Sequence, residues 1–99
     1  MAQTIYKVWL VKPTEAWFQL SPEEQDKLFA QVAEARAQVG GKVILACQSG
    51  WASEQWPFWG VEQFPDNEAN QKFTDLLNAF NWFRYMGSLT VLGTEMPSS

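Results

Sequence analysis

One carboxylate is a candidate for proton-transfer chemistry. Glu62 lies between Val61 and Phe64 in a stretch, residues 58–64, that is typical of a mostly buried strand. Burial disfavours a charged carboxylate and raises its pKa, so that the group can act as a general acid or base. In the alternative interpretation Glu62 occupies a sheet edge or pairs with Arg84 or a lysine, and its role is structural.

Other side chains could complete a site around this carboxylate. A tyrosine can donate a hydrogen bond to a developing oxyanion, and an arginine can hold a substrate carboxylate. Aromatic side chains can supply apolar binding area. The polar candidates are Tyr6, Arg84 and Tyr85, and the candidate pocket walls are Trp9, Trp17 and Trp59. The simpler alternatives are that Trp9 is a core residue and that Trp17, beside Phe18, covers the core from a loop.

The remaining tryptophans are candidates for an interface. Trp51 and Trp56 lie in the predicted loop 50–57, where a dimer seam and a ligand pocket are equally good explanations. Trp82 lies about 180° around a predicted helix from Phe73, since successive helical residues are about 100° apart. It therefore either covers a partner on the solvated face, which we favour, or is buried by a distorted helix end.

Histidine is absent, and this excludes several classes of site. Histidine-based catalytic triads, the zinc sites of deaminases and proteases, and proximal-histidine haem ligation all require it. Cys47 is the single cysteine, so no internal disulfide can form, and it is best explained as a small buried hydrophobe. We expect no metal site and no cofactor.

The charge pattern and the apolar runs exclude further partners. The net charge is −4, and the seven basic residues are scattered singly. Without a basic stripe, binding to nucleic acid or to an anionic membrane is not expected. The longest apolar run, residues 43–47, is far shorter than a membrane span, and the N-terminus lacks the basic region of a signal peptide. We expect a cytoplasmic protein.

The order of predicted elements is strand, helix, strand, strand, helix, strand. The strands are predicted at 5–12, 42–49, 58–64 and 88–94, with loops at 13–20 and 50–57. The first helix begins with the capping-box pattern of residues 21–24 and ends at Gly40-Gly41. The second begins at Asp66 or Asn67 and continues through Arg84 to Gly87. Residues 1–95 form one domain and residues 96–99 a frayed tail.

This order predicts an α+β fold, a ferredoxin-like βαββαβ sandwich with a four-stranded antiparallel sheet and two helices on one face. Both faces of the strands are apolar: Trp9 and Val11 alternate with Val8 and Leu10. Two helices can cover one face only. The other face therefore predicts a homodimer, the dimeric α+β barrel, in which two sheets pack face to face.

The opening of the chain resembles that of small bacterial dimeric α+β-barrel proteins. Residues 8–17 and 20–24 are similar to their strand–KPxxAW–xxLSxEE–helix pattern, and residues 64–66 and 80–83 look similar too. The wider superfamily includes antibiotic-biosynthesis-type monooxygenases and muconolactone isomerase-like proteins. Other members rely on a histidine–aspartate pair or on histidine ligation of haem iron, which this chain cannot supply. The resemblance thus implies the fold and the dimer, and no catalytic residue.

Two functions follow as hypotheses. The first is a small-molecule-binding or enzymatic domain acting on an apolar or aromatic metabolite, in which Glu62 transfers a proton as in an isomerase or a cofactor-free monooxygenase. It requires a closed apolar pocket containing Glu62, and predicts that Glu62→Gln abolishes turnover while leaving the fold intact. The alternative is a non-catalytic dimeric interaction module whose aromatic residues serve protein interfaces.

Overall fold

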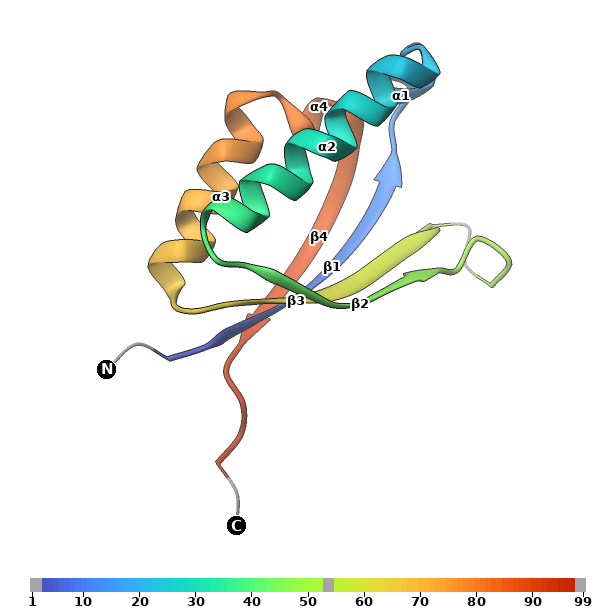
Figure 1. Ribbon diagram of the computed structural model, residues 1–99. Helices are drawn as coiled ribbons and strands as arrows, with labels where there is room; N and C mark the ends of the chain where they lie inside the picture. The colour runs from blue at the N-terminus through green and yellow to red at the C-terminus, as the bar shows by residue number, and fades with distance from the viewer. Residues whose placement is uncertain (1–2, 53–54, 98–99) are drawn as a thin grey trace.

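The computed structural model describes residues 3–52 and 55–97. Four strands and two long helices make up the chain, with a short helix at each of two connections (Figure 1). The elements are β1 (Ile5–Pro13), α1 (Glu15–Phe18), α2 (Pro22–Gln38), β2 (Lys42–Gln48), β3 (Phe58–Phe64), α3 (Asn67–Ala79), α4 (Trp82–Tyr85) and β4 (Met86–Gly93). Of the predicted tail, residues 98–99 lie outside the described residues.

The strands form one antiparallel sheet in the order β2-β3-β1-β4. The two long helices pack on the same face of this sheet (Figure 1). Each half of the chain contributes a strand, a helix and a strand, and the central pair β1 and β3 comes from different halves. The predicted ferredoxin-like α+β fold is therefore confirmed.

Helix α2 begins as its sequence predicts. The Ser21 side chain accepts a hydrogen bond from the Glu24 backbone N–H, and the Glu24 side chain accepts one from the Ser21 backbone. This reciprocal pair satisfies N–H groups that have no partner within the first turn. The predicted loop before it was wrong in part, because residues 15–18 form the short helix α1. That turn carries Trp17 into the core.

The second long helix is not continuous, and this corrects the prediction for Trp82. Helix α3 ends at Ala79, and Asn81 adopts a left-handed backbone with φ of 61°. Asparagine is one of the few residues that visit this conformation readily. The break turns the chain, so that Trp82 begins a separate helix, α4, and is buried rather than solvated. The strand that follows also begins earlier than predicted, at Met86.

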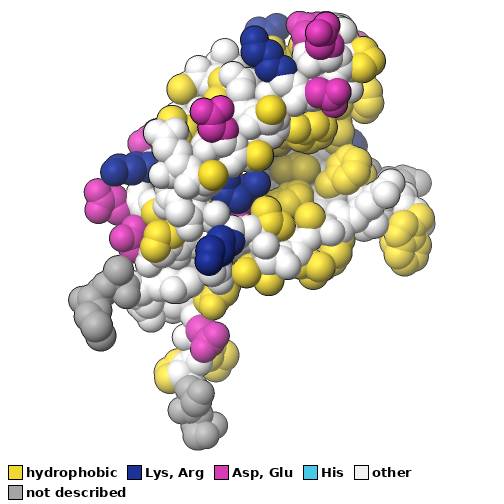
Figure 2. All heavy atoms as spheres, in the orientation of Figure 1, with side chains coloured by type: hydrophobic (Ala, Val, Ile, Leu, Met, Phe, Trp, Pro, Cys, Tyr) yellow, Lys and Arg dark blue, Asp and Glu magenta, His cyan; other side chains and the backbone are white. Residues whose placement is uncertain are grey.

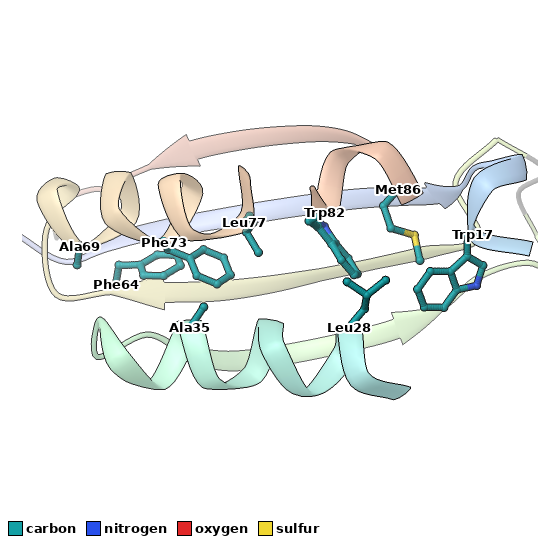
Figure 3. Close-up of a cluster of buried hydrophobic side chains, with 9 residues drawn as sticks. All are labelled: Trp17, Leu28, Ala35, Phe64, Ala69, Phe73, Leu77, Trp82 and Met86. Atoms are coloured by element: carbon teal, nitrogen blue, oxygen red, sulfur yellow. The ribbon is translucent and has the colours of Figure 1, made fainter. Parts of the chain in front are cut away.

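The hydrophobic core lies between the helices and the sheet (Figure 3). Phe64 and Phe73 fill one end, with ring centroids 5.3 Å apart. Trp17 and Trp82 meet edge to face at the other end, at 6.4 Å. The buried apolar residues are Trp17, Leu28, Ala35, Phe64, Ala69, Phe73, Leu77, Trp82 and Met86. The helical layer thus contacts the sheet through large aromatic side chains, which leave space between them.

Candidate functional site

A cavity of about 650 Å³ lies between the sheet and the helical layer. In Figure 2 it appears as a hollow lined by hydrophobic side chains. Its walls come from every helix and from strands β1, β3 and β4, and include Trp9, Trp17, Phe29, Phe73 and Trp82. A cavity of this size is in the range that accommodates a small organic ligand.

Strand β1 sets the long axis of the cavity. Alternate residues Lys7, Trp9, Val11 and Pro13 line it, as the two-residue period of a strand requires. From Lys7 to Pro13 the strand extends about 20 Å at roughly 3.3 Å per residue. The cavity therefore has two distinct ends, one beside Lys7 and one beside Pro13.

The end beside Lys7 holds three charged side chains. Glu62 is the residue opposite Lys7 across the β1–β3 pair, and is 2% exposed. Its Oε2 accepts a hydrogen bond of 2.6 Å from Arg36 Nε on helix α2. Its Oε1 lies 3.8 Å from Lys7 Nζ. One carboxylate thus serves two cations, and the group of three carries a net charge of +1.

Burial disturbs the ionisation of Lys7. Removal of its ammonium from water lowers the pKa below the ordinary 10.5, and the positive charge of Arg36 lowers it further. The negative charge of Glu62 acts in the opposite direction but is outweighed by the burial. The Lys7 cation is therefore only partly compensated by the protein.

Phe73 supports both cations from helix α3. Lys7 Nζ lies 5.1 Å from the centroid of the Phe73 ring, and Arg36 Cζ lies 5.5 Å from it. The face of an aromatic ring attracts cations at such distances, and the attraction is stronger where water is excluded from the site. Phe73 itself is 1% exposed, so its ring contacts both cations from within the core.

Two glycines permit this close packing. A Cβ on Gly60 would overlap the Trp9 indole and would lie 2.6 Å from the backbone oxygen of Leu45. A Cβ on Gly41 would lie 2.9 Å from Arg36 Cγ and 2.7 Å from a Phe64 ring carbon. Both distances are too short for real contacts. Glycine at these positions lets Trp9 lie flat against β3 and lets Arg36 reach Glu62.

The comparisons with known proteins place the chain in a family. Residues 4–99 match the family described as "Family of unknown function (DUF6616)". The chain belongs to this family. No curated protein matches it.

Several solved structures share the fold of this DUF6616 member. A mutant chlorite dismutase from Candidatus Nitrospira defluvii superposes with a TM-score of 0.76 at 13% identity, over 99% of this chain and 42% of that chain. This chain thus spans less than half of the dismutase. A Rhodopseudomonas palustris protein of unknown function superposes with a TM-score of 0.60 at 16% identity, over 99% of this chain and 86% of that chain. A hypothetical Arabidopsis thaliana protein superposes with a TM-score of 0.62 at 12% identity, over 98% of this chain and 92% of that chain. At these identities the likeness shows the fold alone.

The predicted pocket residues are distributed over both faces of the sheet. Glu62, Trp9 and Trp17 line the cavity. Tyr6 and Trp59 do not, because strand alternation turns them to the face without helices, where Trp59 is opposite Leu10. Arg84 and Tyr85 also lie outside the cavity lining, in the short helix α4. The Arg84 guanidinium is exposed and lies 6.0 Å from the Tyr85 ring centroid.

The predicted interface residues differ from one another in exposure. Trp51 is 88% exposed, whereas Trp56 is half-buried and its carbonyl accepts a hydrogen bond from Ser49 Oγ. Residues 53–54 of this loop lie outside the described residues. Trp82 lines the cavity and packs against Trp17 and Phe29, so its burial occurs within one chain.

Sequence reasoning offered a lysine as a partner of Glu62, which Lys7 confirms, but it named neither Lys7 nor Arg36. Lys7 shares the strand face of Trp9 and Val11, so alternation grouped these residues but did not show that their face meets the helices. Arg36 follows Val32 by four residues and therefore lies on the same helix face, which also lines the cavity. The proposed pairing of Glu62 with Arg84 is wrong, because Arg36 takes that place.

The described part of the chain has neither a cluster of metal-ligating side chains nor a membrane-spanning helix. Over residues 3–52 and 55–97, histidine, cysteine, aspartate and glutamate side chains form no group of three that could hold a metal ion. Within the same residues no helix has the length and apolarity needed to cross a membrane.

Proposed function

We propose that this protein binds an apolar or aromatic metabolite in the cavity and transfers a proton within it, with Glu62 as the catalytic group. The observation that carries the proposal is the placement of a buried carboxylate, with two cations beside it, at one end of a largely apolar cavity. Few polar groups, placed at one point of an apolar pocket, are typical of ligand sites.

The chemistry that suits this arrangement is isomerisation by proton transfer. Glu62 takes a proton from an acidic carbon of the ligand, and the electron pair of the broken C–H bond forms an enolate. The neighbouring cations Lys7 and Arg36 stabilise the new negative charge. Return of the proton to a different carbon completes the reaction, with no atom gained or lost. Monooxygenase chemistry would start with the same deprotonation and would require dioxygen as co-reactant.

Hydrogen exchange tests this proposal directly. Phenylacetone, incubated with the protein in D₂O, should lose its benzylic protons faster than in buffer, as followed by NMR. Glu62→Gln should reduce this acceleration by about 10²–10⁴-fold, the usual contribution of a general base. Glu34→Gln, which changes an exposed carboxylate on helix α2, is the matched control. Equal exchange in Glu62→Gln and in the wild-type protein would contradict the assignment of Glu62.

Occupancy of the cavity can be tested separately from chemistry. Val32→Phe adds volume to a residue that lines the cavity, whereas Ala33→Phe adds it to the neighbouring exposed position of the same helix. Aromatic ligands should quench tryptophan fluorescence in the wild-type protein and in Ala33→Phe, because three tryptophans line the cavity. Val32→Phe should bind them more weakly. Equal affinity in all three proteins would place the ligand elsewhere.

The helix-free face of the sheet supports the proposal that the protein is a homodimer. Leu45, Leu89 and Val91 are each about half exposed or more on this face. They surround the partly buried strand residues Val8 and Val61. A continuous apolar surface of this kind favours association, and two copies related by a two-fold axis would cover it on both chains.

Sedimentation equilibrium tests the dimer. The wild-type protein should sediment as a dimer, and Val91→Lys should shift it toward the monomer by placing a charge within the sheet face. Gln71→Lys, on the exposed side of helix α3, should leave the dimer unchanged. A monomeric wild-type protein would exclude this assembly. Binding of another protein by this face, the interaction-module hypothesis, would then be the better explanation.

A further inference from the structure

The geometry points to a ligand that carries one anionic group, a carboxylate, bound at Lys7 with its apolar body extending toward the opposite end of the cavity. This inference rests on the proposed function, because it names the ligand class of the same cavity. It concerns recognition, and does not depend on which proton Glu62 moves.

The charges of the side chains that line the cavity do not cancel. Among the described residues that line the cavity, the charged ones are Lys7, Arg36 and Glu62. The other lining residues are apolar except for Ser88 and Thr90, which are uncharged. The cavity wall therefore carries two positive charges and one negative charge. Because Lys7 and Glu62 are buried among apolar side chains, water screens this excess less than it would at the protein surface.

Arg36 and Lys7 share the Glu62 carboxylate unequally. Arg36 holds Oε2 through a hydrogen bond of 2.6 Å, while Lys7 lies 3.8 Å from Oε1, beyond hydrogen-bonding distance. An ammonium has three hydrogens to donate. Within the described residues Lys7 Nζ has no hydrogen-bonded partner, so a ligand anion in the cavity would supply one that the protein does not. The lowered pKa of Lys7 agrees with this view.

The exposure of the lining residues favours one orientation of the ligand in the cavity. Lys7 is 7% exposed, whereas Phe18, Phe29 and Phe83, which also line the cavity, are 70%, 51% and 40% exposed. Lys7 thus lies in a more buried part of the lining than these three phenylalanines, which lie at its exposed margin. A ligand that enters with its carboxylate first places that group on Lys7 and leaves its apolar body against aromatic walls.

A series of three probes of nearly equal shape tests this inference on the unmodified protein. Biphenyl-4-carboxylate, biphenyl-4-carboxamide and biphenyl-4-methylammonium differ mainly in charge. By titration calorimetry the carboxylate should bind roughly tenfold or more tightly than the amide, as a charge-assisted hydrogen bond implies. The ammonium probe should bind most weakly.

Proton uptake gives a second readout that needs no variant. At a pH where Lys7 is partly deprotonated, a bound carboxylate favours its charged form, so the protein should take up protons when the carboxylate probe binds. Calorimetry in two buffers of different ionisation enthalpy measures that uptake. The amide probe should cause none.

Lys7→Met and Lys12→Met form the matched pair of variants. Lys12 lies on the same strand but is exposed and faces away from the cavity. Lys7→Met should abolish the preference for the carboxylate, and Lys12→Met should keep it. If Lys7→Met fails to fold, the probe series and the proton uptake still decide.

The possible results separate this inference from the proposed function. Equal binding of the carboxylate and the amide, without proton uptake, would overturn the inference and leave the apolar cavity as a binding site. Binding of none of the three probes would contradict the proposed function itself. Preference for the carboxylate that persists in Lys7→Met would place the anion at another residue and would also overturn the inference.

Discussion

Substitution of Glu62 by glutamine should strongly destabilise the protein, contrary to the sequence-based expectation of an intact fold. Among the described residues, Glu62 is the carboxylate that compensates Lys7 and Arg36, whose side chains are 8% and 18% exposed, and the variant removes it. Loss of one partner of a buried ion pair typically costs 3–5 kcal/mol. Because Arg36 keeps some contact with water, we expect the low end, about 3 kcal/mol.

The size of this effect is measurable in a domain of this length. Each kcal/mol lowers the melting temperature by roughly 4–8 °C, so Glu62→Gln should melt roughly 12–24 °C below the wild-type protein. Urea unfolding, followed by tryptophan fluorescence, gives the free energy of unfolding directly. Glu34→Gln, an exposed change on helix α2, should stay within about 0.5 kcal/mol of wild type.

Two further measurements identify the cause. Lys7→Met combined with Glu62→Gln should be more stable than Glu62→Gln alone, because the cation left without a partner is then absent. Biphenyl-4-carboxylate should bind Glu62→Gln more tightly than wild type, since the charge of the cluster rises from +1 to +2. A Glu62→Gln variant as stable as wild type, with unchanged affinity for the carboxylate, would refute the view that Glu62 compensates two buried cations.

Three other predictions concern packing, backbone and pH. Gly60→Ala should lower the free energy of unfolding, measured in urea, by about 1–3 kcal/mol, because the new methyl group would overlap the Trp9 ring and the Leu45 carbonyl. Unchanged stability would show that the sheet can shift to accommodate the methyl group at little cost. Asn81→Ala should be about 1 kcal/mol less stable than Asn81→Gly, since alanine tolerates a φ of 61° poorly; equal melting temperatures would contradict this. Between the lowered pKa of Lys7 in the folded protein and the ordinary value of 10.5, the unfolded chain binds more protons than the folded one. Lys7 should therefore make the free energy of unfolding rise with pH across that window. Melting curves recorded at several pH values should show this rise in the wild-type protein and not in Lys7→Met.

The sequence by itself determined the fold class and most of the element boundaries. Strand composition, the capping box at Ser21 and the glycine pair after the first helix are local signals, and local backbone preferences decide them. It also singled out Glu62, because a carboxylate between apolar strand residues is conspicuous without knowledge of its neighbours. A distorted helix end at Trp82 was one of two alternatives, and the sequence did not decide between them because an apolar helical pattern continues across Asn81.

Only the tertiary structure decided which face of each strand meets the helices and which groups surround Glu62. Both strand faces are apolar, so alternation alone could not separate Trp9, inside the cavity, from Trp59, outside it. Lys7 and Arg36 lie 55 and 26 positions before Glu62 in the chain, and strand pairing and helix packing bring them together. Ion pairs and cavities depend on such distant contacts, whereas strands, turns and helix ends depend mainly on adjacent residues.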